Sequence, residues 1–494
     1  MKRLSYNTLD AINYSGYILK AAPERILQFG EGNFLRGFVD YFFDILNEKG
    51  LFHGKCVVVQ PLEQGNGERI NDQEGLYTLY LRDVEQGDPV TTKRVISVIS
   101  RVINPYHDRQ AFLNCARNPD LRILVSNTTE AGIAFRDTDQ LYDMQGTFPA
   151  KLTSFLWDRY NAFPEESGKG FIILSCELID NNGDALKKCV LQYKELWNLP
   201  DSFSAWIDNE NIFCNTLVDR IITGYPAAES ELMNRENGYE DQVIDTGEPF
   251  AFWAIQGPDC LKRELPFEQA GLPVRIVADQ SYYKKRKVRI LNGAQTCVTL
   301  AAYLAGIDLE REYMDDPLFY KYIQSTIFDE IIPATDLDLS DMQAFAKQCL
   351  LRLSNPFIDH KLLDISLNSV AKWKARVFPT IQDYYIRNRS LPKLLSFSLA
   401  SLLAFYRCEE EEGRFYGMRN GEKYEVRDSM DILRFFSQKS HLPNTEYVHA
   451  YLEAYALHGT DFHALDGLEA QLVHYLNELD RYGMRTVVAK LLGS

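Results

Sequence analysis

The sequence predicts an α/β fold for the first part of the chain and a mostly α-helical fold for the second. The pattern of apolar residues changes once along its 494 residues. From about Glu24 to about Ala278, short β-rich runs alternate with helical stretches, which is typical of a sheet with helices on both faces. Beyond Ser281, helical periodicity predominates. We therefore expect two domains, residues 1–280 and 281–494, and a hydrophobic content of 46% is enough to give each a core.

The individual elements follow from the same pattern. The expected strands of the first part are Arg25–Phe29, Cys56–Gln60, Val95–Ile103, Leu121–Ser126, Phe171–Cys176 and Phe252–Ile255. In the second part, Leu394–Tyr406 and Leu468–Leu492 have helical periodicity. We interpret Asn234–Glu248, with five acidic residues and two glycines, as a surface loop, and Glu409–Gly413 as a solvated turn.

The turn after the first expected strand contains two closely spaced glycines, Gly30 and Gly32, and leads into an amphipathic helix that ends before Gly50. The first amides of a helix lack intrahelical partners and attract anions, and glycine lets the backbone approach a phosphate. The third glycine of the usual dinucleotide fingerprint would fall at Leu35 and is missing. An ordinary strand-to-helix turn therefore remains the alternative.

Composition limits the classes of partner. A net charge of −16 argues against nucleic acid and against an anionic membrane surface. Nine cysteines show neither disulfide-like nor zinc-like spacing, which indicates free thiols, a cytoplasmic protein and no metal site. No apolar run is long enough for a membrane span, and the start of the chain has no signal-peptide core.

Two strand ends carry polar residues that a nucleotide could contact. A ribose-binding acid normally follows the second strand, but here Gln60 stands there, with Glu63 close behind, so the spacing does not separate NAD from NADP. Asn127 and Thr128 follow Leu121–Ser126, at the edge of the sheet where ligands bind. The alternative is that they cap the next helix.

A basic and amide-rich segment begins the second part of the chain. If it is α-helical, Lys287, Leu291 and Gln295 share one stripe and Asn292 lies beside it. A lysine can transfer the proton of a carbinol when its pKa is lowered by burial and by neighbouring cations. The candidate cations are Lys284, Lys285, Arg286 and Arg289. A basic turn on a surface helix is the alternative, although Asn292–Ala294 indicates close approach of another group.

Five segments of the sequence, in the same order, resemble one known family. They are Phe29–Arg36, Ser126–Ile133, Val218–Ile221, Glu248–Phe250 and Lys287–Ala294. Together they are similar to the mannitol dehydrogenase family of polyol-specific long-chain dehydrogenases, over nearly the whole chain. The resemblance implies an N-terminal Rossmann-type domain that binds NAD, a mostly helical C-terminal domain and no metal ion.

Within this family, the chain looks most like the enzymes that act on hexuronates. This resemblance implies hydride transfer that converts D-tagaturonate and NADH to D-altronate and NAD, in galacturonate breakdown. Enzymes of fructuronate and mannonate, and mannitol-type polyol dehydrogenases, are the near alternatives. A dinucleotide-binding protein without turnover is the alternative of a different class. We expect a small sugar-acid ligand and neither nucleic acid nor membrane as a partner.

The resemblance also implies roles for single residues of the catalytic site. Lys287 would be the acid/base, and Asn292 would bind the reacting oxygen. Gln295 stands where the family has histidine, so we expect it to orient the substrate without carrying a proton. Asn182 resembles a second asparagine of the family, with Asn181 as the neighbouring candidate, unless Asn182 is only a helix cap.

The remaining expected contacts concern the cofactor and the substrate carboxylate. The expected cofactor-binding residues are Gly30, Gly32, Asn33, Phe34, Gln60, Asn127 and Thr128. A uronate carboxylate needs a cation, and the candidates are Arg36, Lys372 and Arg376. His360 is a further substrate-binding candidate, because Asn355–Arg376 also looks like the hexuronate enzymes. A structural role for His360 is the alternative.

Overall fold

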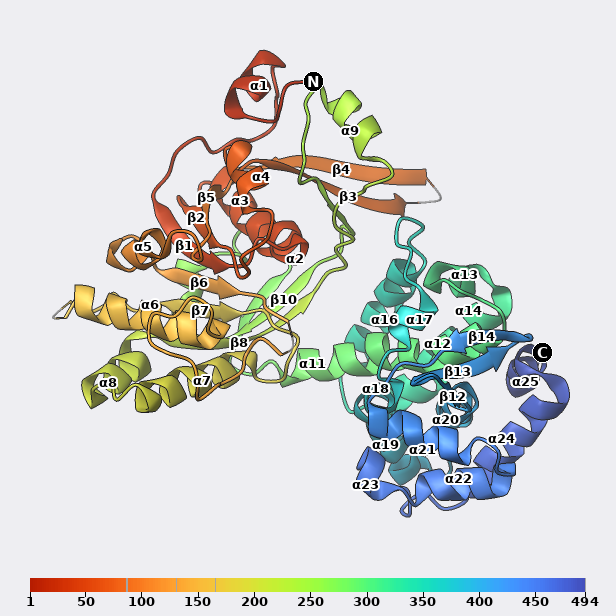
Figure 1. Ribbon diagram of the computed structural model, residues 1–494. Coiled ribbons are helices and arrows are strands. Elements are labelled where there is room, and N and C mark those ends of the chain that lie inside the picture. Colours follow the sequence, from red (N-terminus) through yellow and green to blue (C-terminus); the bar gives the residue numbers. More distant parts are fainter. Residues whose placement is uncertain (86–87, 130, 165, 494) are drawn as a thin grey trace. The chain divides into compact units, whose positions relative to one another are not determined.

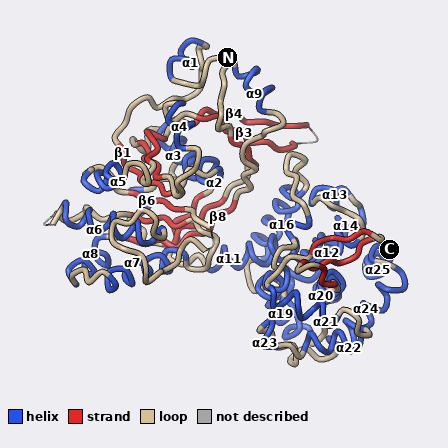
Figure 2. Tube along the Cα trace, in the orientation of Figure 1, coloured by secondary structure: helices blue, strands red, loops and turns tan. Residues whose placement is uncertain are grey.

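The computed structural model describes residues 1–85, 88–129, 131–164 and 166–493, so Glu130 of the segment Ser126–Ile133 lies outside the described residues. The chain divides into two compact units, Met1–Ser281 and Tyr282–Ser494 (Figure 1). Most of the strands, red in Figure 2, belong to the first unit, and the second is mostly helical. The predicted α/β class with a helical second part is confirmed.

One large sheet organises the first unit. Its strands and those of a smaller sheet are β1 Glu24–Phe29, β2 Lys55–Val59, β3 Tyr77–Glu85, β4 Asp88–Ile96, β5 Ile99–Ile103, β6 Ile123–Ser126, β7 Ile172–Ser175, β8 Ile212–Asp219, β9 Asp245–Gly247, β10 Phe252–Gln256 and β11 Val274–Val277. Eight strands form the order β11-β10-β8-β7-β6-β1-β2-β5, and β4-β3-β9 form the smaller sheet. Within the large sheet, only β8 and β10 pair antiparallel.

Helices cover both faces of the large sheet. The helices of this unit are α1 Tyr6–Ala11, α2 Asn33–Leu35, α3 Tyr41–Glu48, α4 Gly67–Asp72, α5 Arg109–Asn114, α6 Phe148–Ala162, α7 Asn182–Leu196, α8 Asp201–Glu210, α9 Ser230–Asn237 and α10 Leu261–Glu264. In β1, Ile26 packs into the core that α3 covers, whereas Leu27 and Phe29 pack into the core that α6 and α7 cover. Burial on both faces explains why strands such as Cys56–Val59 are continuously apolar.

The position of β1 creates a crevice in this sheet. From β1, the chain continues on one side through β2 and β5, and on the other through β6, β7 and β8. Ligands bind at such a reversal, beyond the carboxyl ends of the strands. A Cβ on Gly30 would lie 3.8 Å from the carbonyl oxygen of Asn127, so the turns that follow β1 and β6 are adjacent.

Five of the six predicted strands are confirmed within about two residues, as β1, β2, β6, β7 and β10. The sixth, Val95–Ile103, is wrong as a single strand. β4 ends at Ile96 and β5 begins at Ile99, because the backbone N–H of Ser97 donates to buried Asp44 at 2.9 Å instead of continuing a ladder. A side-chain acceptor thus interrupts an apolar run.

The predicted surface loop Asn234–Glu248 is also wrong. The end of α9 and the whole of β9 lie in it, and the carboxylates of Asp241 and Asp245 are buried. Asp241 accepts hydrogen bonds from the backbone N–H of Thr78 at 2.6 Å and from Nε2 of Gln73 at 2.9 Å. The acids of this segment satisfy buried donors, so acidic composition does not indicate exposure here.

A buried arginine ties distant parts of the first unit together. Arg220 follows β8, is 6% exposed, and burial lowers its pKa. At 2.8–3.1 Å its guanidinium donates to four carbonyl oxygens, those of Gly37, Glu248, Pro249 and Phe250. Because a guanidinium holds five donors in one plane, a single side chain serves carbonyls from two separate segments.

The second unit is a helical assembly with one small sheet. Its helices are α11 Ser281–Lys287, α12 Ala294–Leu304, α13 Glu310–Asp315, α14 Pro317–Ser325, α15 Ile332–Ala334, α16 Leu339–Leu353, α17 Leu362–Ile365, α18 Ser369–Arg376, α19 Phe378–Asn388, α20 Lys393–Phe405, α21 Met430–Lys439, α22 Asn444–Leu452, α23 Tyr455–His458, α24 Leu468–Tyr482 and α25 Met484–Leu491. The sheet contains β12 Glu409–Glu411, β13 Arg414–Arg419 and β14 Glu422–Glu425. None of the helices among the described residues has the length and apolar character of a membrane span.

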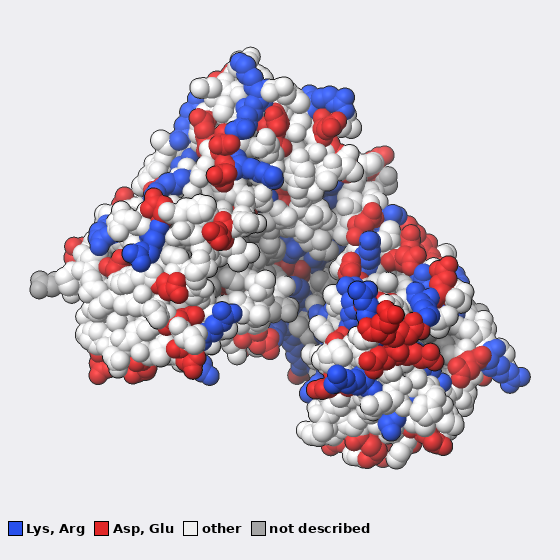
Figure 3. Space-filling view, in the orientation of Figure 1, with Lys and Arg blue, Asp and Glu red and all other residues white. Residues whose placement is uncertain are grey.

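The core of this unit surrounds α20, which packs against α12. α20 is buried along almost its whole length, so the predicted helix Leu394–Tyr406 is confirmed. The predicted helix Leu468–Leu492 is two helices, because Gly483 has a φ of +75° between α24 and α25. The predicted turn Glu409–Gly413 contains strand β12, whose exposed glutamates belong to the acidic area over β12–β14 in Figure 3.

Replacement of Arg220 should destabilise the first unit. Arg220→Gln leaves buried carbonyl oxygens without donors, so we expect a loss of about 3 kcal/mol or more, or roughly 6–12 °C in thermal midpoint. Differential scanning calorimetry measures the shift. The control is Arg3→Gln, which removes an exposed ion pair with Asp72 and should change the midpoint by less than about 2 °C. Equal midpoints for the two variants would contradict this role for Arg220.

Candidate functional site

The turn after β1 combines a strained glycine with an open one. Gly30 has a φ of +124°, a conformation that side chains disfavour, and its amide donates to the carbonyl of Val59 at 3.0 Å. A Cβ on Gly32 would meet no other heavy atom within 4 Å. Gly32 is the N-cap of a helical segment that runs to Glu48, where backbone amides attract an anion. The turn is therefore open at Gly32, beside the first amides of the helix.

The first residues of this helix have different roles. Asn33 is exposed beside Gly32, and its Oδ1 accepts a hydrogen bond from Arg36 at 2.6 Å. Phe34 stacks on Phe38 at 5.0 Å between ring centroids and packs against the sheet core. Asn33 thus stays a candidate for cofactor contact, whereas the contacts of Phe34 are those of a packing residue.

Arg36 does not have the geometry of a substrate-carboxylate ligand, which corrects the prediction. It is 1% exposed, and all three guanidinium nitrogens donate to protein oxygens. Nε donates to the carbonyl of Glu31 at 3.1 Å, and Nη1 to that of Val243 at 2.5 Å. Arg36 therefore fixes the glycine turn against the segment that precedes β9.

Two buried acids explain why a cation is needed there. Burial raises the pKa of Asp40 and of Asp245 to about 7, and the charge of Arg36 opposes the shift in both. Asp40 also accepts a hydrogen bond from the hydroxyl of Tyr77 at 3.3 Å. Arg36 thus offsets the cost of burying these carboxylates beneath the helix.

Gln60 braces the loop after β2. It is 4% exposed, and its Nε2 donates to the carbonyls of Leu62 at 2.7 Å and Glu63 at 3.0 Å. Its Oε1 accepts from the amide of Gly67 at 3.2 Å. Both N–H groups and the amide oxygen are therefore used inside the loop, which corrects the prediction that Gln60 hydrogen-bonds a ribose. A cavity of about 340 Å³ opens beside this loop, at the ends of β2 and β5.

Asn127 and Thr128 lie where β6 ends, as the sequence predicts. They line a cavity of about 460 Å³ together with Leu178. Asn127 donates to the carbonyl of Cys176 at 2.6 Å, and the amide of Thr128 donates to Glu177 at 3.1 Å. The helix-cap alternative is wrong, because the described residues between Thr128 and α6 form turns and bends.

Glu177 is a residue that the sequence analysis missed. It follows β7, is 2% exposed, and burial raises its pKa. It holds Thr128 through both the backbone amide and, at 3.3 Å, the hydroxyl. An acid just beyond a predicted strand was the available signal, but the adjacent asparagines gave a stronger one.

Asn182 has no capacity left for a substrate, which corrects its predicted catalytic role. It is 1% exposed at the first turn of α7. Its amide nitrogen donates to the carbonyls of Glu177 and Thr216, both at 3.0 Å. Its Oδ1 accepts from the amides of Gly183 at 3.0 Å and Thr216 at 2.9 Å. These four bonds saturate a carboxamide, so Asn182 joins β7 to β8, and Asn181 is the exposed member of the pair.

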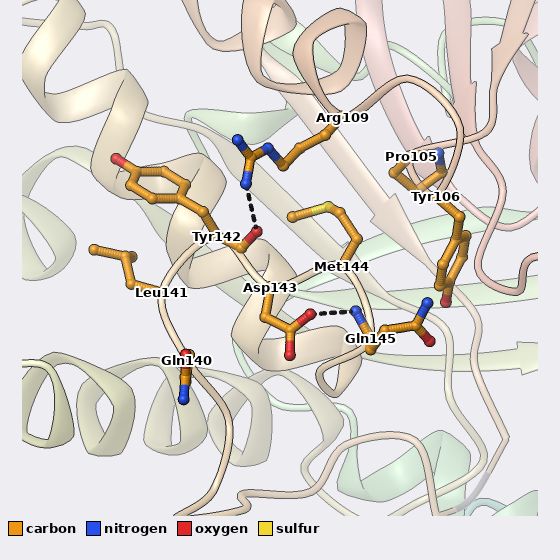
Figure 4. Close-up of a pocket in the computed structure, with 9 residues that line it drawn as sticks. All are labelled: Pro105, Tyr106, Arg109, Gln140, Leu141, Tyr142, Asp143, Met144 and Gln145. Atoms are coloured by element: carbon orange, nitrogen blue, oxygen red, sulfur yellow. Dashed lines mark hydrogen bonds between the residues drawn. The ribbon is translucent and has the colours of Figure 1, made fainter.

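A further cavity of about 470 Å³ lies between the end of β5 and the start of α6 (Figure 4). Arg109 there donates to the carbonyl of Tyr142 at 3.5 Å, and Asp143 accepts from the amide of Gln145 at 2.8 Å. None of the predicted site residues is among its described lining residues. This cavity is therefore separate from the candidate site.

In the second unit, the lysine segment is helical but not α-helical throughout. A π-helical turn, Val288–Gly293, separates α11 from α12. A π turn holds about one residue more than an α turn, so it brings residues five apart, such as Lys287 and Asn292, toward a common face. The predicted α-helical stripe is corrected accordingly. Oδ1 of Asn292 is buried and has no hydrogen-bond partner among the described residues, so it has capacity for a ligand hydroxyl.

The basic residues around Lys287 are largely neutralised. Three of the four form ion pairs with aspartates: Lys285 with Asp336, Arg286 with Asp341 and Arg289 with Asp383. The neighbouring cations that the sequence predicts are therefore present, but each of these three is paired with a carboxylate. They anchor the helix to neighbouring parts of the second unit instead.

A carboxylate that the sequence analysis missed joins two predicted residues. Glu310, at the start of α13, is 3% exposed. Its Oε1 accepts from Nε2 of Gln295 at 2.6 Å, and its Oε2 lies 3.3 Å from Nδ1 of His360. A carboxylate at Nδ1 favours the tautomer that presents Nε2 as an acceptor. Among the described residues, no group of His, Cys, Asp and Glu side chains is arranged to hold a metal ion.

The two cationic candidates of α18 differ in their contacts. Nη1 of Arg376 donates to the hydroxyl of Thr296 at 3.4 Å, and a Cβ on Gly293 would lie 3.1 Å from the Arg376 carbonyl oxygen. This contact is the close approach that the small residues of the lysine segment indicate. Lys372 donates instead to the carbonyl of Ile365 at 2.9 Å. Arg376 therefore lies against the helix of Asn292 and Gln295.

Comparison with known proteins identifies the family. Residues 24–269 match the mannitol dehydrogenase Rossmann domain, and residues 279–480 match the mannitol dehydrogenase C-terminal domain. The chain belongs to the mannitol dehydrogenase family.

Full-length relatives agree with membership of the mannitol dehydrogenase family, and solved structures match the fold. The altronate oxidoreductase of Yersinia enterocolitica is 40% identical over 489 residues, which cover 97% of this chain and 99% of that protein. That of Bacillus subtilis is 39% identical over 489 residues, 98% of this chain and 97% of the relative. The ternary complex of Pseudomonas fluorescens mannitol 2-dehydrogenase with NAD and D-mannitol matches the fold with a TM-score of 0.71, 22% identity and full coverage of both chains. A substrate-free D-sorbitol dehydrogenase gives 0.80 at 20% identity, over 98% of this chain and all of that one.

Two of the five segments that resemble the mannitol dehydrogenase family meet in the first unit, next to the end of a third. Arg220 of Val218–Ile221 donates to carbonyls of Glu248–Phe250 and to that of Gly37, the residue after Phe29–Arg36. These segments therefore mark the packing that holds the glycine turn, as well as the turn itself.

The open glycine should tolerate a side chain in folding but not in cofactor binding. Gly32→Val fills empty space at a residue with φ −64° and ψ 158°, which valine adopts. We expect NADH binding, followed by fluorescence titration, to weaken about tenfold or more, with little change in thermal midpoint. Gly30→Val is the matched control and should lower the midpoint, because φ is +124° there. Normal NADH affinity of Gly32→Val would contradict this location.

Proposed function

We propose that this protein is an NAD-dependent oxidoreductase of hexuronate catabolism that interconverts D-tagaturonate and D-altronate. The observation that carries the proposal is identity of about 40%, over nearly the full length of both chains, with altronate oxidoreductases of two different bacteria. The alternative of a binding protein without turnover has no need of a lysine beside a buried, unpartnered amide oxygen.

The first unit would hold the dinucleotide. Gly32 leaves room at a helix start, and Asn127 and Thr128 line the cavity beyond β6. Both features lie at the carboxyl edge of the sheet, where a Rossmann-type fold binds a dinucleotide. The mannitol 2-dehydrogenase with this fold was solved with NAD. NADH, when bound, supplies the hydride that reduces the keto carbon of tagaturonate.

The second unit would transfer the proton to or from the substrate oxygen. In the reduction, Lys287 gives a proton to the oxygen of the keto group as that oxygen becomes an alkoxide. The Asn292 amide holds the same oxygen, and its unpartnered Oδ1 accepts a hydrogen bond from the hydroxyl that results. Gln295 is fixed by Glu310 and cannot carry a proton, so its role is to orient the substrate.

The substrate carboxylate needs a cation in the second unit. Arg376 fits this role best, because it lies against the helix of Asn292 and Gln295 and a guanidinium can bind a carboxylate with two hydrogen bonds. His360, whose Nδ1 lies 3.3 Å from Oε2 of Glu310, would also contact the substrate. Lys372 is a weaker candidate, since its amine donates to the carbonyl of Ile365.

We further infer that the protein works in the cytoplasm on a small sugar acid. All nine cysteines are free thiols, and eight of them are buried. Unpaired thiols suit a reducing compartment.

A substrate panel tests the proposed reaction. Purified protein with NADH is expected to reduce tagaturonate at least about tenfold more efficiently, in kcat/KM, than fructuronate or fructose. NADH absorbance at neutral pH measures the rate, with altronate and NAD for the reverse direction. A preference for fructuronate would identify the mannonate enzyme, and a preference for fructose a mannitol-type enzyme. NADH binding without turnover on any of the three would leave only the binding-protein alternative.

Lys287 should be essential for turnover. Lys287→Ala is expected to lower kcat for tagaturonate by a factor on the order of 10² or more, because the general acid is lost. The matched control is Lys285→Ala, two residues earlier on the same helix, whose amine pairs with Asp336. This control should keep kcat within about threefold. Unchanged turnover in Lys287→Ala would contradict this mechanism.

A further inference from the structure

A buried carboxylate with one unpartnered oxygen, that of Glu31, stands between the two glycines of the turn. Glu31 is 7% exposed, and burial raises its pKa. Its Oε1 accepts one long hydrogen bond, from the amide of Asn66 at 3.4 Å, and its Oε2 is buried without a partner among the described residues. Leaving a buried carboxylate oxygen unpaired costs about 1–3 kcal/mol or more. A group of this kind needs an explanation other than stability.

The side chain of Glu31 reaches from the end of β1 to the loop after β2. A Cβ on Gly65 would lie 2.2 Å from Oε1 of Glu31, so the carboxylate and the loop are in direct contact. Gly65 also lines the cavity of about 340 Å³ at the ends of β2 and β5. In nucleotide-binding sheets, the acid that binds the adenine ribose stands at the end of the second strand. The Glu31 carboxylate reaches that place from a different element.

The other groups at this place are less suited to bind a ribose. Gln60 follows β2 directly, but its amide is occupied within the loop. Glu63 and Glu68 line the cavity and are exposed, so water already satisfies them. Among these groups, Glu31 alone combines burial with an unpartnered oxygen.

We propose that Glu31 accepts hydrogen bonds from the adenine-ribose hydroxyls of the dinucleotide and thereby selects NAD(H) over NADP(H). A carboxylate pairs with a ribose hydroxyl but repels the 2′-phosphate of NADP(H). Since the loop around Gly65 covers the carboxylate, binding requires this loop to shift away from Glu31. The inference rests on the dinucleotide of the proposed function and is independent of the sugar.

Cofactor affinity without sugar provides the test. Dissociation constants of NADH and NADPH are measured by fluorescence titration for the wild type and for Glu31→Gln, which keeps the size of the side chain. The wild type is expected to bind NADH at least about tenfold more tightly. In Glu31→Gln, NADH affinity should fall about tenfold and NADPH affinity should not fall, so that the preference disappears. Glu31→Ala should lose the preference in the same way.

Three control variants separate Glu31 from its neighbours. Glu63→Gln and Glu68→Gln should keep the wild-type preference. Arg69 donates to Asn66 at 3.5 Å and is a cation of the same loop, so Arg69→Gln should leave NADH affinity unchanged. Thermal midpoints of all variants verify that they are folded.

The outcomes are distinct. An unchanged NADH/NADPH ratio in folded Glu31→Gln or Glu31→Ala would overturn the inference, and a changed ratio only in Glu63→Gln or Glu68→Gln would assign the role to that acid. Selective NADH binding without reduction of tagaturonate would refute the proposed substrate and leave the role of Glu31 intact. A wild type that binds neither dinucleotide would refute both.

Discussion

The parallel pairing of β1 with β2 on one side and β6 on the other is the constraint on which the rest of the first unit depends. This pairing brings together the turns that follow β1 and β6, so that Gly30 faces the carbonyl of Asn127. One cavity of the candidate cofactor site lies at the ends of β2 and β5, and the other is lined by residues that follow β6 and β7. An extended ligand that lies along this edge would contact the loop after β2, then the glycine turn, and then the polar residues that follow β6.

Elements that depend on burial alone could be predicted from the sequence. β1, β2, β6 and β7 are covered on both faces, so their apolar runs are continuous and easy to recognise. Segments whose polar residues are buried could not be predicted, because composition does not reveal the partner. Asp241 accepts a bond from Thr78, 163 residues away, and its acidic neighbours resemble an exposed loop until that contact is known.

The same limit applies to the candidate site. Residue types and spacing identified Lys287, Asn292 and Gln295 correctly as members of one helix. They gave no sign of Glu310, which lies 15 residues beyond Gln295 and 50 before His360, yet contacts both. They also gave Arg36 and Asn182 chemical roles, although burial and saturated hydrogen bonding make both of them parts of the scaffold. The same residue type can bind a substrate or brace a loop. Only the surroundings of the side chain show which role it has.

Both candidate helices contain a π turn, Arg36–Asp40 beside the glycine turn of the first unit and Val288–Gly293 in the lysine segment of the second. A π turn is less favourable than an α turn and persists only where other contacts satisfy the carbonyl groups that it displaces. In the first unit, the carbonyl of Arg36 accepts from the hydroxyl of Tyr77, and that of Gly37 accepts from Arg220, both at 2.8 Å. In the second, the carbonyl of Asn292 accepts from the hydroxyl of Thr296 at 2.7 Å. The residues that supply these donors never need to touch a ligand, yet the geometry of the glycine turn and of the lysine segment depends on them. This dependence gives a physical reason for Val218–Ile221, which contains no proposed ligand, to stand among the segments that mark the family.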